Sequence, residues 1–186
     1  MLEENNAYGK EKGNIMVMKI YDDILDKQFL DYINHSLLSM KWISHASTNN
    51  QETPLFFNSE TIDENVRKEE YIFLFRIIIS IIGKEPEVKR KNILLERGYV
   101  NLYPFGIGGD WHTDSENPNS KTILFYPSDW KEEYGGATEF QESEEKVEYK
   151  KNRLLMFDGI IPHRSAVHQN PKNRYTIAFK TNIGYK

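Results

Sequence analysis

The sequence of 186 residues contains no cysteine, which excludes a disulfide framework, a thiolate-bound zinc site and a cysteine nucleophile. A bound metal ion must therefore be held by histidine, aspartate or glutamate. Histidine is also scarce, because the chain has only five: His35, His45, His112, His163 and His168. The metal-binding options of the chain are narrow enough to consider one by one.

Long hydrophobic runs and an excess of positive charge are also missing. The most apolar run, residues 71–82, is interrupted by Arg76, and a membrane helix needs about 20 apolar residues. Residues 1–14 are polar and lack the apolar core of a signal peptide, so we expect a disordered tail and a soluble, cytoplasmic protein without a membrane partner. With 24 basic and 28 acidic residues the net charge is −4, which disfavours a nucleic-acid partner.

The remaining residues, 15–186, have the length of a single domain, in which residues 15–92 show a mainly helical pattern. We expect a first strand near residue 15, a helix after residue 26 and a second helix over residues 63–82. Residues 43–60 are polar and are predicted to form a loop or a lid. The residues behind this prediction are the caps Asp26 and Asp63, the apolar positions Leu30, Ile33, Leu37 and Leu38, and the helix terminators Gly83 and Pro86.

Residues 93–182 have a different pattern, in which short segments rich in β-branched and aromatic residues alternate with turn residues. Regular short strands of this kind are typical of a β-sandwich or barrel. The predicted fold is therefore mainly β, a β-sandwich or jelly-roll core flanked by N-terminal helices. The predicted strands are 93–103, 121–126, 137–140, 146–149, 154–157, 165–168 and 175–182.

Two of the five histidines fall in a pattern that predicts a metal site. His112 and Asp114 are two residues apart, so on a strand their side chains would point to the same face. A third candidate, His163, follows an apolar strand and a turn. Two imidazoles and one carboxylate leave three positions of an octahedral metal ion open, which is typical of non-haem Fe(II) oxygenases. A structural zinc site would use all its positions for protein ligands.

Arg174 and Thr176 indicate what else such a site would bind. They are two residues apart at the start of the last predicted strand, so they share one face of it. Arginine presents a planar fork that suits two-point recognition of a carboxylate. An arginine that points into a small β-barrel is costly unless an anion is bound there. A dicarboxylate cosubstrate would supply that anion.

Together these residues resemble the Fe(II)/2-oxoglutarate-dependent dioxygenase superfamily, and within it the prolyl-4-hydroxylase-like branch. The resemblance covers roughly residues 93–182 and implies a double-stranded β-helix, or jelly-roll, core with N-terminal helices. The matching positions are Tyr103, Gly106, His112, Asp114, residues 135–140 with the pair Gly135 and Gly136, His163, Arg174 and Thr176.

The resemblance also implies roles for individual residues. The implied Fe(II) ligands are His112, Asp114 and His163. The implied ligands of the distal carboxylate of 2-oxoglutarate are Arg174, Thr176 and Tyr103. O₂ is the second cosubstrate, and ascorbate is an additional cofactor that the family admits. The implied reaction hydroxylates a protein or peptide side chain, prolyl residues included, or a small molecule, and releases succinate and CO₂.

The substrate and the oligomeric state are left open by the sequence. Prolyl hydroxylases commonly have lysine where this chain has Arg174, which weakens the case for proline itself. Oxidative demethylases of alkylated nucleic-acid bases are a second hypothesis, since Asn101 and Tyr103 match them in part; those enzymes usually have a second arginine where Lys180 stands here. A third hypothesis is a non-catalytic jelly-roll binding module. The histidines expected in structural or solvated positions are His35, His45 and His168.

Overall fold

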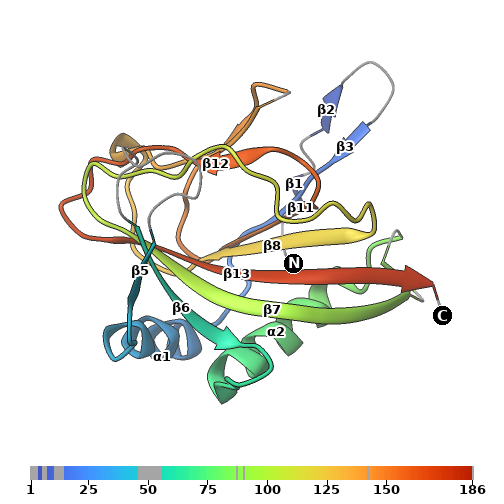
Figure 1. The fold of residues 1–186 in the computed structure, drawn as a ribbon, viewed down its shortest axis with the longest axis horizontal. Helices are drawn as coiled ribbons and strands as arrows, with labels where there is room; N and C mark the ends of the chain where they lie inside the picture. Colours follow the sequence, from blue (N-terminus) through green and yellow to red (C-terminus); the bar gives the residue numbers. More distant parts are fainter. Residues whose placement is uncertain are drawn as a thin grey trace.

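The computed structural model describes residues 4–5, 8–10, 15–45, 56–86, 88–89, 91–141 and 143–185 of the chain. These residues form a mainly β fold with two α-helices, as the sequence predicts (Figure 1). All strand pairs among them are antiparallel. Among the described residues, neither helix is both long and hydrophobic enough to cross a membrane.

A large sheet of eight strands forms the centre of the molecule. Its strands, in spatial order, are β1 (Glu4–Asn5), β4 (Lys19–Tyr21), β11 (Arg153–Asp158), β8 (Ser120–Tyr126), β13 (Arg174–Tyr185), β7 (Lys91–Tyr103), β6 (Phe56–Ile62) and β5 (Ile43–His45). A small sheet contains β10 (Lys146–Val147), β9 (Thr138–Phe140) and β12 (His163–Ser165), and β2 (Tyr8–Lys10) pairs with β3 (Ile15–Val17). A short 3₁₀ helix, η1, covers Glu132–Tyr134.

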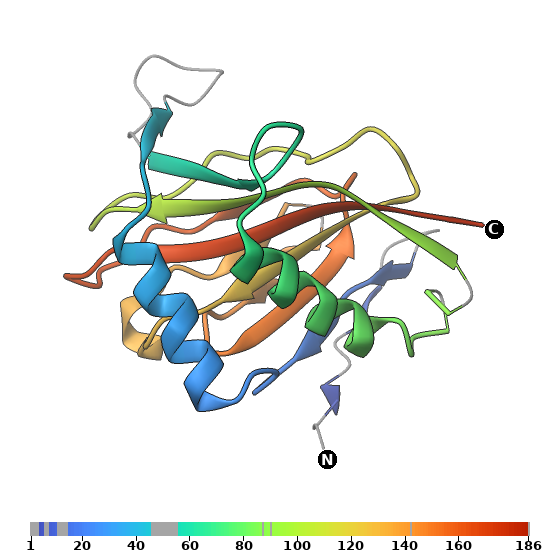
Figure 2. The same cartoon turned by 90° about the horizontal axis from the view of Figure 1, so that it is seen from below.

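The two faces of the large sheet are covered by different layers. The helices α1 (Lys27–Leu38) and α2 (Glu69–Ile82) pack on one face, where Figure 2 shows them side by side. The small sheet covers the other face and encloses a second apolar cluster. Side chains alternate along β13 accordingly, since Ile177 and Phe179 belong to the helix-side core and Ala178 to the other. This alternation decides which residues of the strand can reach the space between the sheets.

The helices differ from the prediction at their ends. The carboxylate of Asp26 caps α1, accepting a hydrogen bond from the Phe29 backbone N–H at 2.9 Å. Leu38 was expected in the buried stripe but is 75% exposed, because α1 ends there. The second helix begins at Glu69 and not at Asp63. The Asp63 carboxylate instead accepts backbone N–H groups two and three residues ahead, which closes a turn before the helix.

The segments expected to be loop or tail are partly strand. Residues 43–60 contribute β5 and most of β6 to the edge of the large sheet, while residues 46–55 lie outside the described part of the chain. The expected first strand is interrupted at Met18, so β3 and β4 join different sheets. Within residues 1–14 only β1 and β2 are described, so the disordered tail and the single domain over 15–186 stay predictions.

Candidate active site

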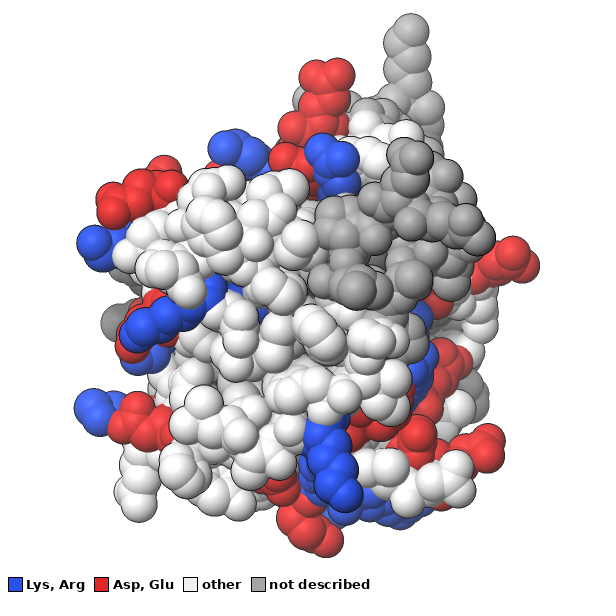
Figure 3. Space-filling view, turned by 60° about the vertical axis from the view of Figure 1, so that its left-hand side comes forward, with Lys and Arg blue, Asp and Glu red and all other residues white. Residues whose placement is uncertain are grey.

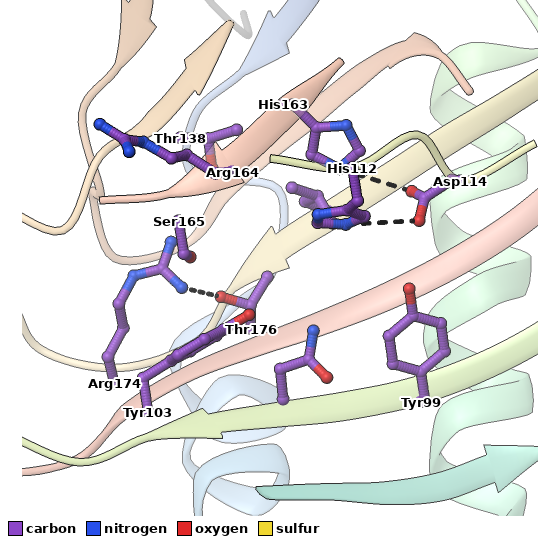
Figure 4. A pocket seen from close by; sticks show the side chains of 12 residues that line it. Tyr99, Tyr103, His112, Asp114, Thr138, His163, Arg164, Ser165, Arg174 and Thr176 are labelled. Atoms are coloured by element: carbon purple, nitrogen blue, oxygen red, sulfur yellow. Dashed lines mark hydrogen bonds and ion pairs between the residues drawn. The ribbon is translucent and has the colours of Figure 1, made fainter. Parts of the chain in front are cut away.

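A pocket of about 350 Å³, part of it open to solvent, lies between the two sheets (Figure 4). The large sheet contributes residues of β7, β8 and β13, and the small sheet contributes residues of β9 and β12. The segment 104–119, which joins β7 to β8, adds two further side chains. The residues that line the pocket are Tyr99, Asn101, Tyr103, His112, Asp114, Leu124, Thr138, His163, Arg164, Ser165, Arg174 and Thr176. All six predicted site residues are among them.

His112 and Asp114 lie in the segment between β7 and β8, and not on a regular strand as their spacing suggested. His112 forms an isolated antiparallel bridge with His163. The His112 N–H donates to the His163 carbonyl at 3.1 Å, and the His163 N–H donates back at 2.9 Å. The Asp114 N–H donates to the Gly159 carbonyl at 2.9 Å. Long-range backbone hydrogen bonds therefore produce the convergence that we had attributed to one strand.

The candidate metal ligands present their side-chain atoms to one small space. One ligand atom from each of His112, Asp114 and His163 lies within 4.8 Å of the others. The His112 Nε2 is 3.8 Å from Asp114 Oδ1, and the His163 Nε2 is 3.6 Å from Asp114 Oδ2. Both pairs are marked in Figure 4. These residues form the only such cluster of three or more histidine or acidic side chains found among the described residues.

Backbone carbonyls orient both imidazoles. The Nδ1 of His112 lies 2.8 Å from the Asp110 carbonyl, and the Nδ1 of His163 lies 2.9 Å from the Ile161 carbonyl. A carbonyl only accepts, so each Nδ1 carries a hydrogen, and in a neutral ring with this tautomer the Nε2 lone pair is free. Burial lowers the pKa of His163 to about 4, against the opposing effect of Asp114, so this ring is neutral at physiological pH. Neutral imidazoles fixed in this tautomer are suited to metal binding.

The carboxylate of Asp114 is buried, with 3% of its side chain exposed. Its Oδ2 accepts a hydrogen bond from the Thr122 hydroxyl at 2.5 Å, and its Oδ1 lies 3.1 Å from the Lys180 ammonium. Burial alone would raise the pKa of Asp114, but His163, Lys180 and the Thr122 hydroxyl together hold it below its usual value. The candidate ligand is therefore an anion that hydrogen bonds hold in place.

Arg174 lies on the same pocket at the start of β13, and it is 1% exposed. Its Nε donates to the Gly136 carbonyl at 2.9 Å, and its Nη1 donates to the Thr176 hydroxyl at 2.7 Å. Among the described residues its Nη2 has no hydrogen-bond partner, although it is buried. An unsatisfied donor on a buried cation fits an incoming carboxylate.

Aromatic rings and a tight turn enclose this guanidinium. The rings of Tyr103, Tyr126 and Tyr149 lie 5.5, 5.7 and 5.0 Å from its central carbon. Gly136 has a φ of +76°, and a Cβ there would lie 3.2 Å from the Arg174 Cδ. The glycine at position 136 therefore permits a close approach of this turn to the Arg174 side chain. Burial raises the pKa of Tyr103, so its hydroxyl stays protonated and able to donate.

The donor set fits the cofactors of an Fe(II)/2-oxoglutarate enzyme. Three ligands of nitrogen and oxygen type leave coordination positions free, which suits Fe(II) with a chelating cosubstrate. The unpaired Nη2 of Arg174 fits the far carboxylate of a dicarboxylate. Both features open into one pocket, which is what a cosubstrate bound at its two ends requires.

The remaining histidines lie outside the cluster. His168 is buried; its Nε2 lies 3.0 Å from the Tyr103 carbonyl, and its Nδ1 accepts the Asn170 backbone N–H at 3.3 Å. Its role is structural, at an isolated bridge with Gly135 and not in the strand expected over 165–168. His35 is exposed at the end of α1, and the side chain of His45 lies outside the described residues.

Several pocket features were missed or left open by the sequence analysis. The contacts of Thr122 and Lys180 with Asp114 had no local signal in the sequence. Arg97 pairs with Glu60 and is not among the residues that line the pocket. Asn101 does line it, and its Oδ1 has no hydrogen-bond partner among the described residues.

Comparisons with known proteins match this chain to a family and to a fold. The family model of the 2OG-Fe(II) oxygenase superfamily matches residues 99–180, a stretch that contains all six predicted site residues. No curated protein matches the sequence. A prolyl-4-hydroxylase from Pseudomonas putida has a similar structure, with 12% identity and a TM-score of 0.67 over 89% of this chain and 92% of that one.

Two further solved structures are similar, each over 89% of this chain. One is a prolyl hydroxylase from Trichoplax adhaerens in complex with a hypoxia inducible factor peptide fragment, at 18% identity, a TM-score of 0.68 and 83% of that chain. The other is HygX from Streptomyces hygroscopicus with nickel, 2-oxoglutarate and hygromycin B bound, at 10% identity, a TM-score of 0.68 and 82% of that chain. At such identities the likeness shows the fold, and it confirms the predicted jelly-roll.

Proposed function

Residues 99–180 belong to the 2OG-Fe(II) oxygenase superfamily, and from this membership we propose that the chain hydroxylates a protein or peptide side chain, or a small molecule. The products of the cosubstrate would be succinate and CO₂. Fe(II), 2-oxoglutarate and O₂ are the cofactor and cosubstrates of this superfamily. Bound iron supplies the oxygen chemistry, and the protein supplies binding and orientation.

The proposed division of roles follows the two ends of the pocket. His112, Asp114 and His163 would hold the iron through two Nε2 atoms and one carboxylate oxygen. Because the Ile161 carbonyl keeps the hydrogen of His163 on Nδ1 and burial keeps that ring neutral, no proton has to leave His163 before the metal binds. The low pKa of Asp114 likewise keeps this ligand ionised.

At the other end, Arg174 would bind the distal carboxylate of 2-oxoglutarate through its free Nη2. Thr176 accepts from Nη1 and so directs the guanidinium, and its hydroxyl hydrogen is available to the same carboxylate. The Tyr103 hydroxyl is a third donor on this side of the pocket. The Nη2 of the buried Arg174, which has no hydrogen-bond partner among the described residues, lies in the same pocket as the His–Asp–His cluster and is the observation that carries the proposal.

Peptides and small molecules are favoured over nucleic acid as substrates. The surface in Figure 3 has an uncharged centre, and basic and acidic side chains alternate around it. No continuous basic area is visible among the described residues of that face, whereas a nucleic-acid backbone binds to clustered lysine and arginine. The Trichoplax enzyme was solved with a peptide and HygX with hygromycin B, so proteins of this fold can bind a peptide or a small molecule.

Anaerobic addition of Fe(II) and 2-oxoglutarate tests the site directly. We expect a weak visible charge-transfer band in the wild-type protein, and release of succinate once O₂ is admitted with a substrate. His163→Ala and Asp114→Ala should lose both signals. His35→Ala is the matched control, since this histidine is exposed and distant from the pocket, and it should keep them.

The class of substrate is tested by comparing the rate of succinate formation with and without each candidate substrate. Proline-containing peptides, small hydroxylatable compounds and alkylated single-stranded DNA would be compared at two salt concentrations. Turnover with DNA that falls steeply with salt would replace the present proposal with base demethylation. Absence of both the band and 2-oxoglutarate turnover would refute the proposed oxygenase activity.

A further inference from the structure

Two residues on neighbouring strands contact the same carboxylate. In the register of β8 and β13, Thr122 lies directly opposite Lys180. The Thr122 hydroxyl donates to Asp114 Oδ2 at 2.5 Å, and the Lys180 ammonium lies 3.1 Å from Oδ1. Lys180 also donates to the Asp114 backbone carbonyl at 3.4 Å. The Thr122–Lys180 pair therefore contacts both oxygens of the candidate ligand.

The direction of the Asp114 side chain depends on contacts with other side chains more than the directions of the two imidazoles do. It lies in the segment between β7 and β8, where no ladder of strand hydrogen bonds determines its direction. Each imidazole is oriented by a carbonyl close to it in sequence, but the described hydrogen bonds of the Asp114 carboxylate come from the large sheet. A buried carboxylate whose two oxygens are held from one sheet has a single preferred rotamer.

A cation at a neighbouring position in the sheet does not by itself contact Asp114, as Arg97 shows. It is the cross-strand neighbour of Lys180 on β7, and both cations lie over the ring of Tyr99, at 5.0 Å for Arg97 and 5.6 Å for Lys180. Arg97 is directed outward, however, where it pairs with Glu60 and is 44% exposed. Lys180 is 23% exposed and pairs with Asp114.

We propose that Thr122 and Lys180 are positioning residues that hold the Asp114 carboxylate in its ligating direction before the metal binds. This inference rests on the proposed role of Asp114 as an iron ligand. Groups that orient a metal ligand typically change metal affinity by about 10- to 100-fold when they are removed. Removing a positive charge near a metal ion should instead raise the metal affinity, because it removes repulsion. Weaker metal binding by a Lys180 variant therefore indicates lost orientation of Asp114, and tighter binding indicates relieved charge repulsion.

Titration of the apoprotein with Co(II), followed by its visible absorption, tests the proposal without turnover. Lys180→Met and Thr122→Val should each weaken Co(II) binding by about tenfold or more and change the shape of the absorption bands. Lys180→Arg should restore most of the affinity, because a guanidinium can donate to the same oxygen. Arg97→Met is the matched control and should leave affinity and spectrum unchanged. Melting temperatures of the metal-free variants show whether each has folded.

The possible results of the Co(II) titrations lead to different conclusions. Equal or tighter Co(II) binding by folded Lys180→Met would overturn the proposal, as would failure of folded Lys180→Arg to recover affinity. If Lys180→Met does not fold, Thr122→Val alone decides, since unchanged binding in that variant overturns the proposal. If the wild-type protein does not bind Co(II) or Fe(II), the ligand assignment under the proposed function fails, which is a different result.

Discussion

Replacement of Arg174 by methionine should abolish the response of the protein to 2-oxoglutarate at little cost to the stability of the unliganded chain. The wild-type protein already contains a buried cation whose Nη2 is unpaired within the described part of the chain. Removing the charge relieves a desolvation cost, which offsets the loss of hydrogen bonds to Gly136 and Thr176. The bound dicarboxylate, in contrast, loses its charged partner.

The expected loss of affinity for 2-oxoglutarate follows from the buried position of the Arg174 guanidinium. Loss of one partner of a buried charged pair costs about 2–5 kcal/mol, and about 3 kcal/mol corresponds to a Kd raised about 150-fold. A ligand at about 100 times its Kd stabilises the wild-type protein by about 2.7 kcal/mol, or about 5–11 °C in Tm for a chain of this length. The same concentration should stabilise the variant by about 0.3 kcal/mol, or about 1 °C.

Thermal unfolding with saturating Mn(II), a redox-stable substitute for Fe(II), with and without 2-oxoglutarate measures this shift. Arg153→Met is the matched control. Arg153 pairs with Asp22 through its Nε at 2.7 Å and its Nη2 at 3.0 Å, so its loss should destabilise the unliganded protein more than Arg174→Met does. That control should keep the full ligand-induced shift. An Arg174→Met variant that keeps more than half of the wild-type shift would refute the reasoning.

His163→Ala should abolish Fe(II) binding in equilibrium dialysis, whereas His168→Ala should keep the metal and lower Tm, since the His168 ring hydrogen-bonds to the backbone of Tyr103 and Asn170 and packs against Trp130; the reverse result would exchange the two assignments. Burial lowers the pKa of His168 from its ordinary 6.5, so the unfolded chain binds a proton that the folded chain does not. Stability present above pH 6.5 should therefore be lost as the pH falls, and denaturant unfolding of His168→Gln should show a shallower pH dependence than wild type; equal slopes would contradict this. Gly136→Ala should lower Tm and reduce the 2-oxoglutarate shift, because a Cβ at a φ of +76° would lie 3.0 Å from the His168 Cβ and 3.2 Å from the Arg174 Cδ; an unchanged shift would show that the guanidinium tolerates the displacement.

The β half of the fold was accessible to sequence analysis because strands carry a local signal. Alternation with a period of two placed Arg174 and Thr176 on one face, and the structure places both beside the pocket. Turn residues marked most strand ends within a few positions. The start of α2 was predicted wrongly because Asp63 caps a turn as readily as it caps a helix, and only the surrounding chain decides between them.

The convergence of the candidate ligands was predicted, but for a partly wrong reason. His112 and Asp114 do not share a regular strand. His112 is placed by paired backbone hydrogen bonds with His163, and Asp114 by a hydrogen bond to Gly159, contacts that link residues far apart in sequence. Such contacts leave no trace in the spacing of neighbouring residues, which is why the three side chains converge as predicted while the predicted secondary structure of His112 and Asp114 was wrong.

By itself, the sequence determined the chemistry available to this protein. Without cysteine, a metal site had to use imidazole and carboxylate, and the spacing of two histidines, one aspartate and one arginine pointed to an oxygenase. Tertiary structure decided how that chemistry is arranged: which nitrogen of each imidazole faces a backbone carbonyl, that one Arg174 donor has no partner among the residues described, and that Thr122 and Lys180 contact the same carboxylate. The physical reason is that residue type and local period act over a few positions, whereas hydrogen-bond satisfaction depends on how distant strands are aligned.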